Sequence, residues 1–240
     1  MATSHGRQPK PHVLLLTGAP GIGKTTVIRR VAGQLEAKEL RGFYTEEIRE
    51  GGERRGFRLA SFEGKERVIA HVAFSKSHRV GKYGVDVATL DAAASLLAPD
   101  PAAKTYLVDE IGKMECLSER FVGAMRALLA GQAPVVATVG LRGRGFIAEV
   151  KRSKECLLWE VTHANRDELP ARIVAWLAEA GSSGQLGPAT TAKRGSPKRV
   201  RVSLTGSCGI SPPERKAKTA RVSLWREGGY GLSNSRFGPR

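Results

Sequence analysis

A glycine-rich loop between an apolar strand and an amphipathic helix restricts the fold of this chain more than any other feature of its sequence. Residues 18–25 read GAPGIGKT and match the spacing G-x-x-x-x-G-K-[ST]. Residues 12–17 before the loop make an apolar run of strand length, as expected for a strand buried on both faces of a parallel sheet. After Lys24, apolar residues recur at helical spacing to about Lys38. This order of strand, loop and helix is the context that a phosphate-binding loop requires.

The loop predicts contacts with a nucleoside triphosphate. Its backbone N–H groups are expected to surround the β-phosphate while the following helix points its N-terminus at the anion. Lys24 is expected to reach the β- and γ-phosphates, and the hydroxyl of Thr25 to bind the Mg²⁺ ion that bridges them. The residues predicted to bind the nucleotide here are Gly18, Ala19, Pro20, Gly21, Ile22, Gly23, Lys24, Thr25 and Thr26.

A second apolar strand, at residues 105–108, ends on Asp109 and Glu110. Asp109 is predicted to hold Mg²⁺ through water, so that Thr25 and Asp109 together place the metal. Glu110 is predicted to lie beside the γ-phosphate and act as the general base that polarises an attacking water. The expected catalytic residues are therefore Lys24 and Glu110, and the acid pair favours hydrolysis over transfer of the phosphoryl group to a second substrate.

Strands and helices alternate along the rest of residues 11–180, which predicts an α/β domain with a mostly parallel sheet and helices on both faces. Two β-rich runs around Gly51 and Gly52 predict a β-hairpin added to this sheet. The sequence predicts hairpin strands at 42–48 and 54–59, further strands at 68–72, 134–139 and 157–162, a polar loop at 79–83, and helices at 91–98, 118–130 (with Ser118 as N-cap) and 169–180.

The composition changes at residue 181. Residues 181–240 carry 12 Lys and Arg against two Asp and Glu, and they are rich in Gly, Ser and Pro with few apolar side chains. Such a segment is predicted to be a disordered, basic tail, and residues 1–10 a flexible N-terminus. Clustered basic residues bind nucleic-acid phosphates, so a nucleotide-gated nucleic-acid-binding protein stays an alternative, beside a non-specific polycation.

Cysteine usage and the N-terminal sequence indicate the compartment. Cys116, Cys156 and Cys208 lie far apart without a metal-binding or disulfide spacing, which favours a reducing interior. The first apolar stretch is too short for a signal peptide or a membrane helix. We expect an intracellular, cytoplasmic protein without a membrane partner, and nuclear entry through the basic tail stays open.

The motif DEIG at residues 109–112 also fits the D-x-x-G pattern of regulatory GTPases. A guanine reader of the N-K-x-D type should then follow a late strand, whereas residues 165–168 read NRDE. We therefore expect broad base tolerance.

A cation beyond Lys24 is expected near the γ-phosphate. The candidates are Arg79, Lys113, Arg142, Arg144 and Arg166, with Arg142 and Arg144 placed first because they follow a strand, and with Arg166 as a possible contact to base or ribose.

Several stretches together resemble one family, the small nucleoside-triphosphatases known in animals as cancer-related nucleoside-triphosphatase, which have thermostable relatives in thermophilic microbes. The resemblance spans about residues 10–180, and the hairpin, RVGKY and DEIGKME segments are not general features of phosphate-loop proteins. The matching stretches are TGAPGIGKTT at 17–26, GFYTEEIREGGERRGF at 42–57, RVGKYGVD at 79–86, VDEIGKMEC at 108–116 and VTHANRDELP at 161–170.

This resemblance implies a monomeric, Mg²⁺-dependent phosphate-loop NTPase with a RecA-like sheet. It implies slow hydrolysis of ATP, GTP, CTP and UTP to the diphosphate and phosphate, with residues 18–25 on the phosphates and Asp109 and Glu110 beside them. A kinase of a small metabolite or nucleotide is the alternative enzyme. The segment 140–155 matches the family only loosely, and residues 181–240 have no counterpart in it.

Overall fold

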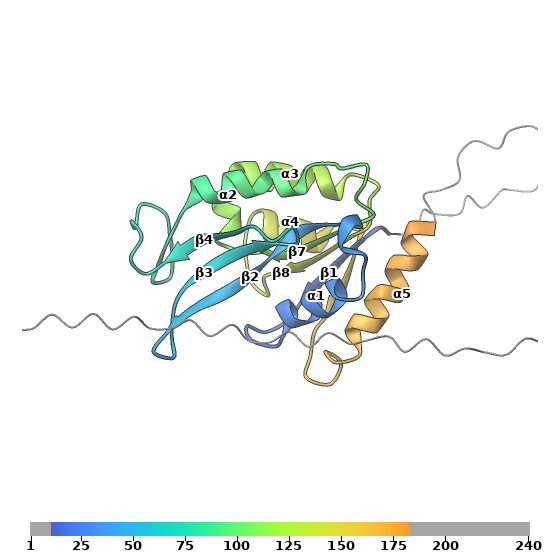
Figure 1. The fold of residues 1–240 in the computed structure, drawn as a ribbon, viewed down its shortest axis with the longest axis horizontal. Helices are drawn as coiled ribbons and strands as arrows, with labels where there is room; N and C mark the ends of the chain where they lie inside the picture. Colours follow the sequence, from blue (N-terminus) through green and yellow to red (C-terminus); the bar gives the residue numbers. More distant parts are fainter. Residues whose placement is uncertain (1–10, 183–240) are drawn as a thin grey trace, which may run out of the picture. The chain divides into compact units, whose positions relative to one another are not determined.

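The computed structural model of the chain describes residues 11–182, which form an α/β fold around a nine-stranded sheet (Figure 1). Across the sheet the strand order is β5-β6-β4-β3-β2-β7-β8-β1-β9. The strands are β1 (Val13–Thr17), β2 (Leu40–Glu50), β3 (Glu53–Ser61), β4 (Glu66–His71), β5 (Arg79–Val80), β6 (Tyr83–Val85), β7 (Thr105–Ile111), β8 (Val135–Val139) and β9 (Cys156–Glu160).

The sheet has a parallel half and an antiparallel half that share β2. Strands β2, β7, β8, β1 and β9 pair in parallel, whereas β3, β4, β6 and β5 continue from β2 in antiparallel pairs. The expected hairpin is present as β2 and β3, and its first strand also pairs with β7 through Leu40–Phe43. The hairpin is therefore continuous with the central sheet, and the mostly parallel core is confirmed.

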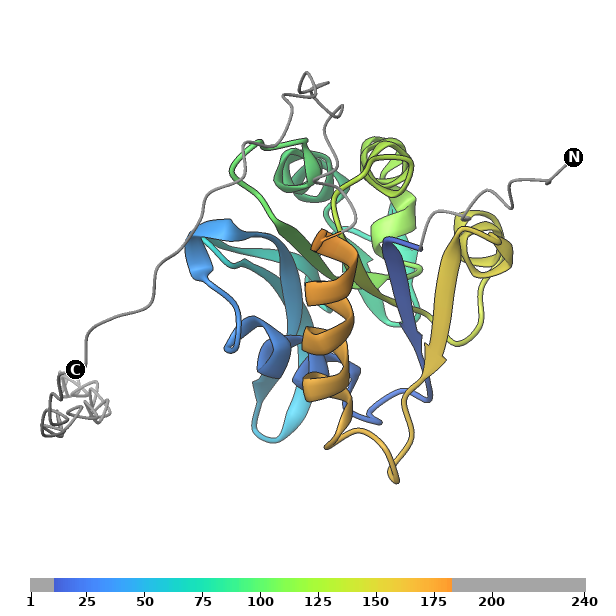
Figure 2. The same cartoon turned by 90° about the vertical axis from the view of Figure 1, so that its right-hand side faces the viewer.

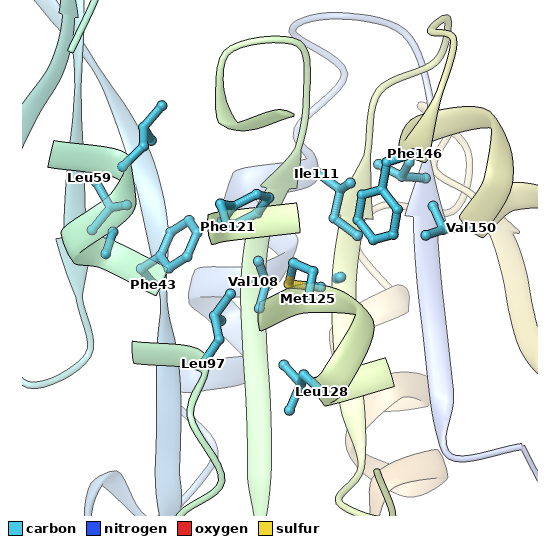
Figure 3. Close-up of a cluster of buried hydrophobic side chains, with 14 of the residues drawn as sticks. Phe43, Leu59, Leu97, Val108, Ile111, Phe121, Met125, Leu128, Phe146 and Val150 are labelled. Atoms are coloured by element: carbon cyan, nitrogen blue, oxygen red, sulfur yellow. The ribbon is translucent and has the colours of Figure 1, made fainter. Parts of the chain in front are cut away.

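Helices cover both faces of the sheet, as predicted. Helices α2 (Val87–Ala93), α3 (Glu119–Leu129) and α4 (Phe146–Arg152) lie on one face, and α1 (Lys24–Ala32) and α5 (Leu169–Ser182) lie side by side on the other (Figures 1 and 2). Alternate side chains of β1 enter the two cores because successive strand residues point to opposite faces. Val13 and Leu15 join the first core, and Leu14 and Leu16 join the second. Figure 3 shows other members of the first core, among them Phe43 of β2 and Phe121 of α3.

Helix α1 is shorter than predicted. It ends at Ala32 instead of continuing to about Lys38, and a 3₁₀ turn, η1 (Ala37–Glu39), follows. Gly33 is the C-cap, and its N–H donates to the carbonyl of Arg29 at 3.0 Å. Glycine is a weak helix former, so it ends the helix although the apolar periodicity continues beyond it.

Helix α2 begins earlier than predicted, at Val87 instead of Asp91, and gives way at Ala94 to a 3₁₀ turn, η2 (Ala94–Leu97). The reason is a cap: the side chain of Asp86 accepts a hydrogen bond from the N–H of Thr89 at 3.0 Å. An aspartate in this position satisfies a backbone donor of the first turn. The sequence signal for this helix start, which the prediction missed, is the N-cap residue Asp86 three positions before Thr89.

The predicted polar loop at 79–83 is wrong, because β5 and β6 form a small antiparallel pair there. Val80 pairs with Tyr83, which leaves Gly81 and Lys82 as the turn. Gly81 has a φ of 59°, a value that such two-residue turns require and that glycine adopts readily.

The predicted cap of α3 is confirmed. The hydroxyl oxygen of Ser118 accepts from the N–H of Phe121 at 2.9 Å and donates to Asp91 at 2.5 Å. A 3₁₀ turn, η3 (Glu115–Leu117), precedes it, and α5 runs to Ser182, just past the expected domain end. Among residues 11–182, no helix is long and apolar enough to span a bilayer. The flexible N-terminus and the tail predicted beyond α5 lie outside the described residues.

Replacing Gly42 with alanine is expected to destabilise the fold by at least about 2 kcal/mol. Gly42 has a φ of 110°, and a Cβ there would lie 2.0 Å from the carbonyl oxygen of Leu107 in β7. The matched control is Gly123→Ala in α3, where a Cβ meets no atom within 4 Å and should stabilise the helix by up to about 1 kcal/mol. Denaturant unfolding of both variants measures the difference, and equal stability would contradict the close approach of β2 and β7.

Candidate nucleotide-binding site

The glycine loop lies at the carboxyl end of β1 and leads directly into α1. The parallel strands β7, β8 and β9 end at the same edge, which is where ligands bind in open α/β sheets. Gly23 precedes the helix with a φ of 111°, a conformation that favours glycine. A Cβ on Gly18 would lie 2.6 Å from the carbonyl oxygen of Val161, so the loop packs tightly against the segment after β9.

Lys24 folds back over the loop that precedes it. Its Nζ donates to the carbonyl of Gly18 at 3.2 Å, and its side chain is only 11% exposed. The same Nζ lies 4.0 Å from Oε2 of Glu110. The two side chains that the sequence indicated as catalytic therefore meet as an ion pair at the edge of the sheet.

Asp109 is buried and accepts hydrogen bonds from three threonine hydroxyls. Thr25 of α1 donates to Oδ2 at 2.6 Å, Thr138 of β8 donates to Oδ1 at 2.5 Å, and Thr45 of β2 donates to Oδ2 at 3.4 Å. Asp109 is 1% exposed, so these bonds replace water around its carboxylate. The sequence paired Thr25 with Asp109 but missed Thr45 and Thr138, because their strands flank β7 only in the folded sheet.

The oxygen atoms of Thr25 and Asp109 suit a magnesium ion. Mg²⁺ prefers hard oxygen ligands and is usually held by one or two carboxylates together with substrate phosphates. Within the described part of the chain, no group of three or more His, Cys, Asp or Glu side chains could hold a metal ion without such help. This hydroxyl–carboxylate pair therefore fits a magnesium ion that arrives with a nucleotide.

Glu110 is half-buried beside Asp109 at the end of β7. Burial raises the pKa of its carboxyl, the charge of Asp109 raises it further, and Lys24 opposes both effects. A raised pKa brings a carboxylate closer to the range in which it exchanges protons at neutral pH. The carboxyl that the sequence predicted as a general base therefore lies beside Asp109 with a raised pKa.

A second carboxyl group, which the sequence did not indicate, lies next to Glu110. A Cβ on Gly112 would lie 2.6 Å from Oε2 of Glu115 and 2.7 Å from Oε1 of Glu110, so both carboxyls converge on Gly112. Glu115 is 4% exposed. Burial, followed by the charge of Glu110, raises the pKa of Glu115 to about 8. Glu115 therefore carries a proton at neutral pH.

The five candidate cations are not brought together. Arg166 contacts the phosphate loop, because its Nη1 donates to the carbonyl of Ile22 at 3.3 Å. Arg142 and Arg144 are exposed in the loop between β8 and α4, and Lys113 is exposed after β7. Arg79 lies on β5 at the far edge of the sheet, where it bonds the carbonyl of Gly81.

Comparison with known proteins gives one consistent match. A family model described as NTPase matches residues 13–174. The nucleoside-triphosphatase THEP1 of Thermotoga maritima is 34% identical over 166 residues, which cover 68% of this chain and 94% of that protein. The cancer-related nucleoside-triphosphatase of Homo sapiens is 32% identical over 178 residues, covering 67% and 94%. The chain belongs to this nucleoside-triphosphatase family.

Solved structures of the nucleoside-triphosphatase family share the fold. The crystal structure of THEP1 from the hyperthermophile Aquifex aeolicus superposes with a TM-score of 0.63 at 34% identity, covering 68% of this chain and 98% of that one. The solution structure of the human cancer-related nucleoside triphosphatase gives 0.60 at 31% identity, covering 70% and 97%. The family expected from the sequence is therefore confirmed, and its model includes the glycine loop, the acid pair, Thr138 and Arg166.

Glu115→Gln is expected to remove a pH dependence from the stability of the protein without nucleotide and metal. The unfolded chain has the ordinary carboxyl pKa of 4.5, and the folded chain holds this proton up to about pH 8. The contribution of the protonated group is therefore complete below pH 4.5 and is lost as the pH rises through 8. Between pH 5 and pH 8.5 the unfolding free energy of the wild type should fall by roughly 3 kcal/mol or more relative to that of Glu115→Gln.

Unfolding free energies measured across this pH range test the effect of Glu115. Glu115→Ala serves as the control, since it leaves a cavity and should be less stable than Glu115→Gln at every pH, yet it should share the flatter profile of Glu115→Gln. A wild-type profile that is equally flat would contradict a buried proton at this position.

Proposed function

We propose that this member of the family hydrolyses nucleoside 5'-triphosphates to the diphosphate and inorganic phosphate. The observation that supports this most is the position of Glu110: its carboxylate faces Lys24 at 4.0 Å, beside the metal-binding pair Thr25 and Asp109. Lys24 and Thr25 belong to the phosphate loop, and Asp109 and Glu110 lie beside it, so a γ-phosphate bound to the loop would have both an ammonium group and a carboxylate base nearby.

Different groups of the site bind different parts of the nucleotide and its metal ion. The backbone N–H groups of residues 18–25 surround the β-phosphate, and the N-terminus of α1 adds a partial positive charge. On nucleotide binding, the Nζ of Lys24 exchanges its bond to Gly18 for bonds to the β- and γ-phosphates. Thr25 and Asp109 would hold Mg²⁺, which would supply positive charge to offset the negative charge that develops on the phosphates.

Glu110 supports the attack of water. Its carboxylate accepts a proton from a water molecule whose oxygen forms a bond to the γ-phosphorus, while the bond from that phosphorus to the β–γ bridging oxygen breaks. The leaving electron pair stays on the β-phosphate, where Lys24 and the loop stabilise it. A neutral Glu115 next to Glu110 adds no further negative charge to this cluster at neutral pH.

Base tolerance extends the proposal to ATP, GTP, CTP and UTP. Residues 165–168 lack the guanine-specific arrangement, so no side chain of this segment is expected to select one base. Transfer of the phosphoryl group to a small metabolite is distinguished from hydrolysis by labelled γ-phosphate: the label appears as inorganic phosphate in a phosphatase and on the acceptor in a kinase.

Lys24→Ala is expected to lower phosphate release by at least about 100-fold, since it removes the cation that contacts the transferred group. Lys104→Ala is the matched control, because Lys104 is 73% exposed and pairs with Glu39 away from the loop. Phosphate release from each of the four nucleotides with Mg²⁺, and with a chelator in its place, gives the rates. Activity that persists in Lys24→Ala would place the reaction elsewhere.

Glu110→Gln is expected to keep nucleotide affinity and to slow hydrolysis by roughly 100- to 10,000-fold, because glutamine preserves the shape but accepts no proton. Glu119→Gln, an exposed position in the first turn of α3, controls for the loss of a charge. Single-turnover hydrolysis and equilibrium binding separate the two effects. Wild-type turnover in Glu110→Gln would show that a different group activates the water.

A further inference from the structure

The order of the parallel strands gives the direction in which a bound nucleotide runs along the edge of the sheet. Glu110 lies near the end of β7, the phosphate loop follows β1, and β9 lies on the far side of β1. Three strand spacings place β7 and β9 roughly 14 Å apart. With the γ-phosphate at Glu110 and the β-phosphate in the loop, as proposed above, the sugar and base extend toward the segment 161–168 after β9.

The segment 161–168 packs directly against the phosphate loop. The N–H of Val161 donates to the carbonyl of Thr17 at 2.7 Å, at the point where the loop begins. Farther along, Arg166 bonds the carbonyl of Ile22, and a Cβ on Gly23 would lie 3.7 Å from its Cδ. Arg166 therefore lies against the second half of the loop, at the start of α1, on the side away from Glu110.

Two other polar side chains of the segment are already used to hold its shape. The amide of Asn165 accepts from the N–H of Thr162 at 2.9 Å and donates to the carbonyl of Glu160 at 2.8 Å. Asp167 pairs with Arg30 of α1 at 2.8 Å. Asn165 occupies the position at which a guanine-binding residue was expected. Both ends of its amide make hydrogen bonds within residues 160–165. These two bonds fix the orientation of the Asn165 amide from within its own segment.

Arg166 differs from the arginines around it. Arg29 and Arg30 pair with Glu46 and Asp167, whereas Arg166 has no carboxylate within 4.0 Å among residues 11–182. It is half-buried, and one of its five N–H donors bonds the loop, which leaves most of the guanidinium unused. A guanidinium bonded through one N–H group keeps a planar face that can stack on an aromatic ring.

We infer that Arg166 positions the nucleoside by stacking the plane of its guanidinium on the face of the base, an assignment that rests on the proposed function. Every base has such a face, so the contact holds purines and pyrimidines alike. Residues 18–25 bind the phosphates, and Arg166 contacts the nucleoside. Base tolerance then arises from a contact with the face of the base in place of hydrogen bonds to its edge.

Calorimetric titration of the full chain with Mg²⁺ tests this role, using ADP, GDP, CDP, UDP and inorganic pyrophosphate as ligands. Arg166→Ala should raise the dissociation constants of all four nucleotides by a similar factor, roughly tenfold, and leave that of pyrophosphate within about twofold. Arg166→Lys should show most of the same loss, because it keeps the charge without the plane. Arg152→Ala, an exposed position on α4, removes the same charge and should change none of the five.

Three outcomes would overturn the assignment. An equal loss for pyrophosphate would make Arg166 a phosphate contact, a loss confined to one nucleotide would make it a reader of base edges, and unchanged affinities would remove it from the site. Retained pyrophosphate binding shows that each variant keeps its phosphate loop. Since diphosphates lack the γ-phosphate that the proposed reaction removes, the titration stays informative even if phosphate release from triphosphates is absent and the proposed function fails.

Discussion

The carboxylate of Asp109 and its three threonine partners tie together the parts of the protein that matter for nucleotide binding. A charge this deeply buried is costly unless hydrogen bonds replace water around it. Here the donors come from the start of α1, from β2 and from β8, while Asp109 itself ends a run of buried residues in β7. Four elements are thus held at one point, and the phosphate loop is aligned with the acid pair before any ligand arrives.

Sequence reasoning succeeded where the information is local. The loop at 18–25, the acids near the end of a buried strand, and the serine that caps α3 each depend on neighbours within a few residues, so their spacing was sufficient to locate them. It failed where distant strands meet. Thr138 is an ordinary residue of an apolar strand until β8 is placed between β1 and β7, and Glu115 is an ordinary acid until η3 folds it onto Gly112.

The ends of helices α1 and α2 were also missed by the sequence prediction. Apolar periodicity gave the positions of α1 and α2 but not their limits, because Gly33 and Asp86 act through the backbone, which periodicity does not register. The choice among five candidate cations was beyond the sequence for a different reason. All five are basic residues with plausible positions, and only the packing of the segment after β9 against Gly18 and Ile22 brings one of them onto the loop.

The shared strand β2 has a consequence for engineering the molecule. Because its first residues pair with β7 and Thr45 bonds Asp109, the hairpin is not a detachable module, and removing it would open the site. Its tip is the opposite case. Gly51 and Gly52 both have positive φ, and a Cβ on either would meet no atom within 4 Å. A peptide tag inserted between them would extend from a two-stranded arm whose first strand also bonds Asp109 through Thr45, so a label there would lie outside the site yet be joined to it by one strand.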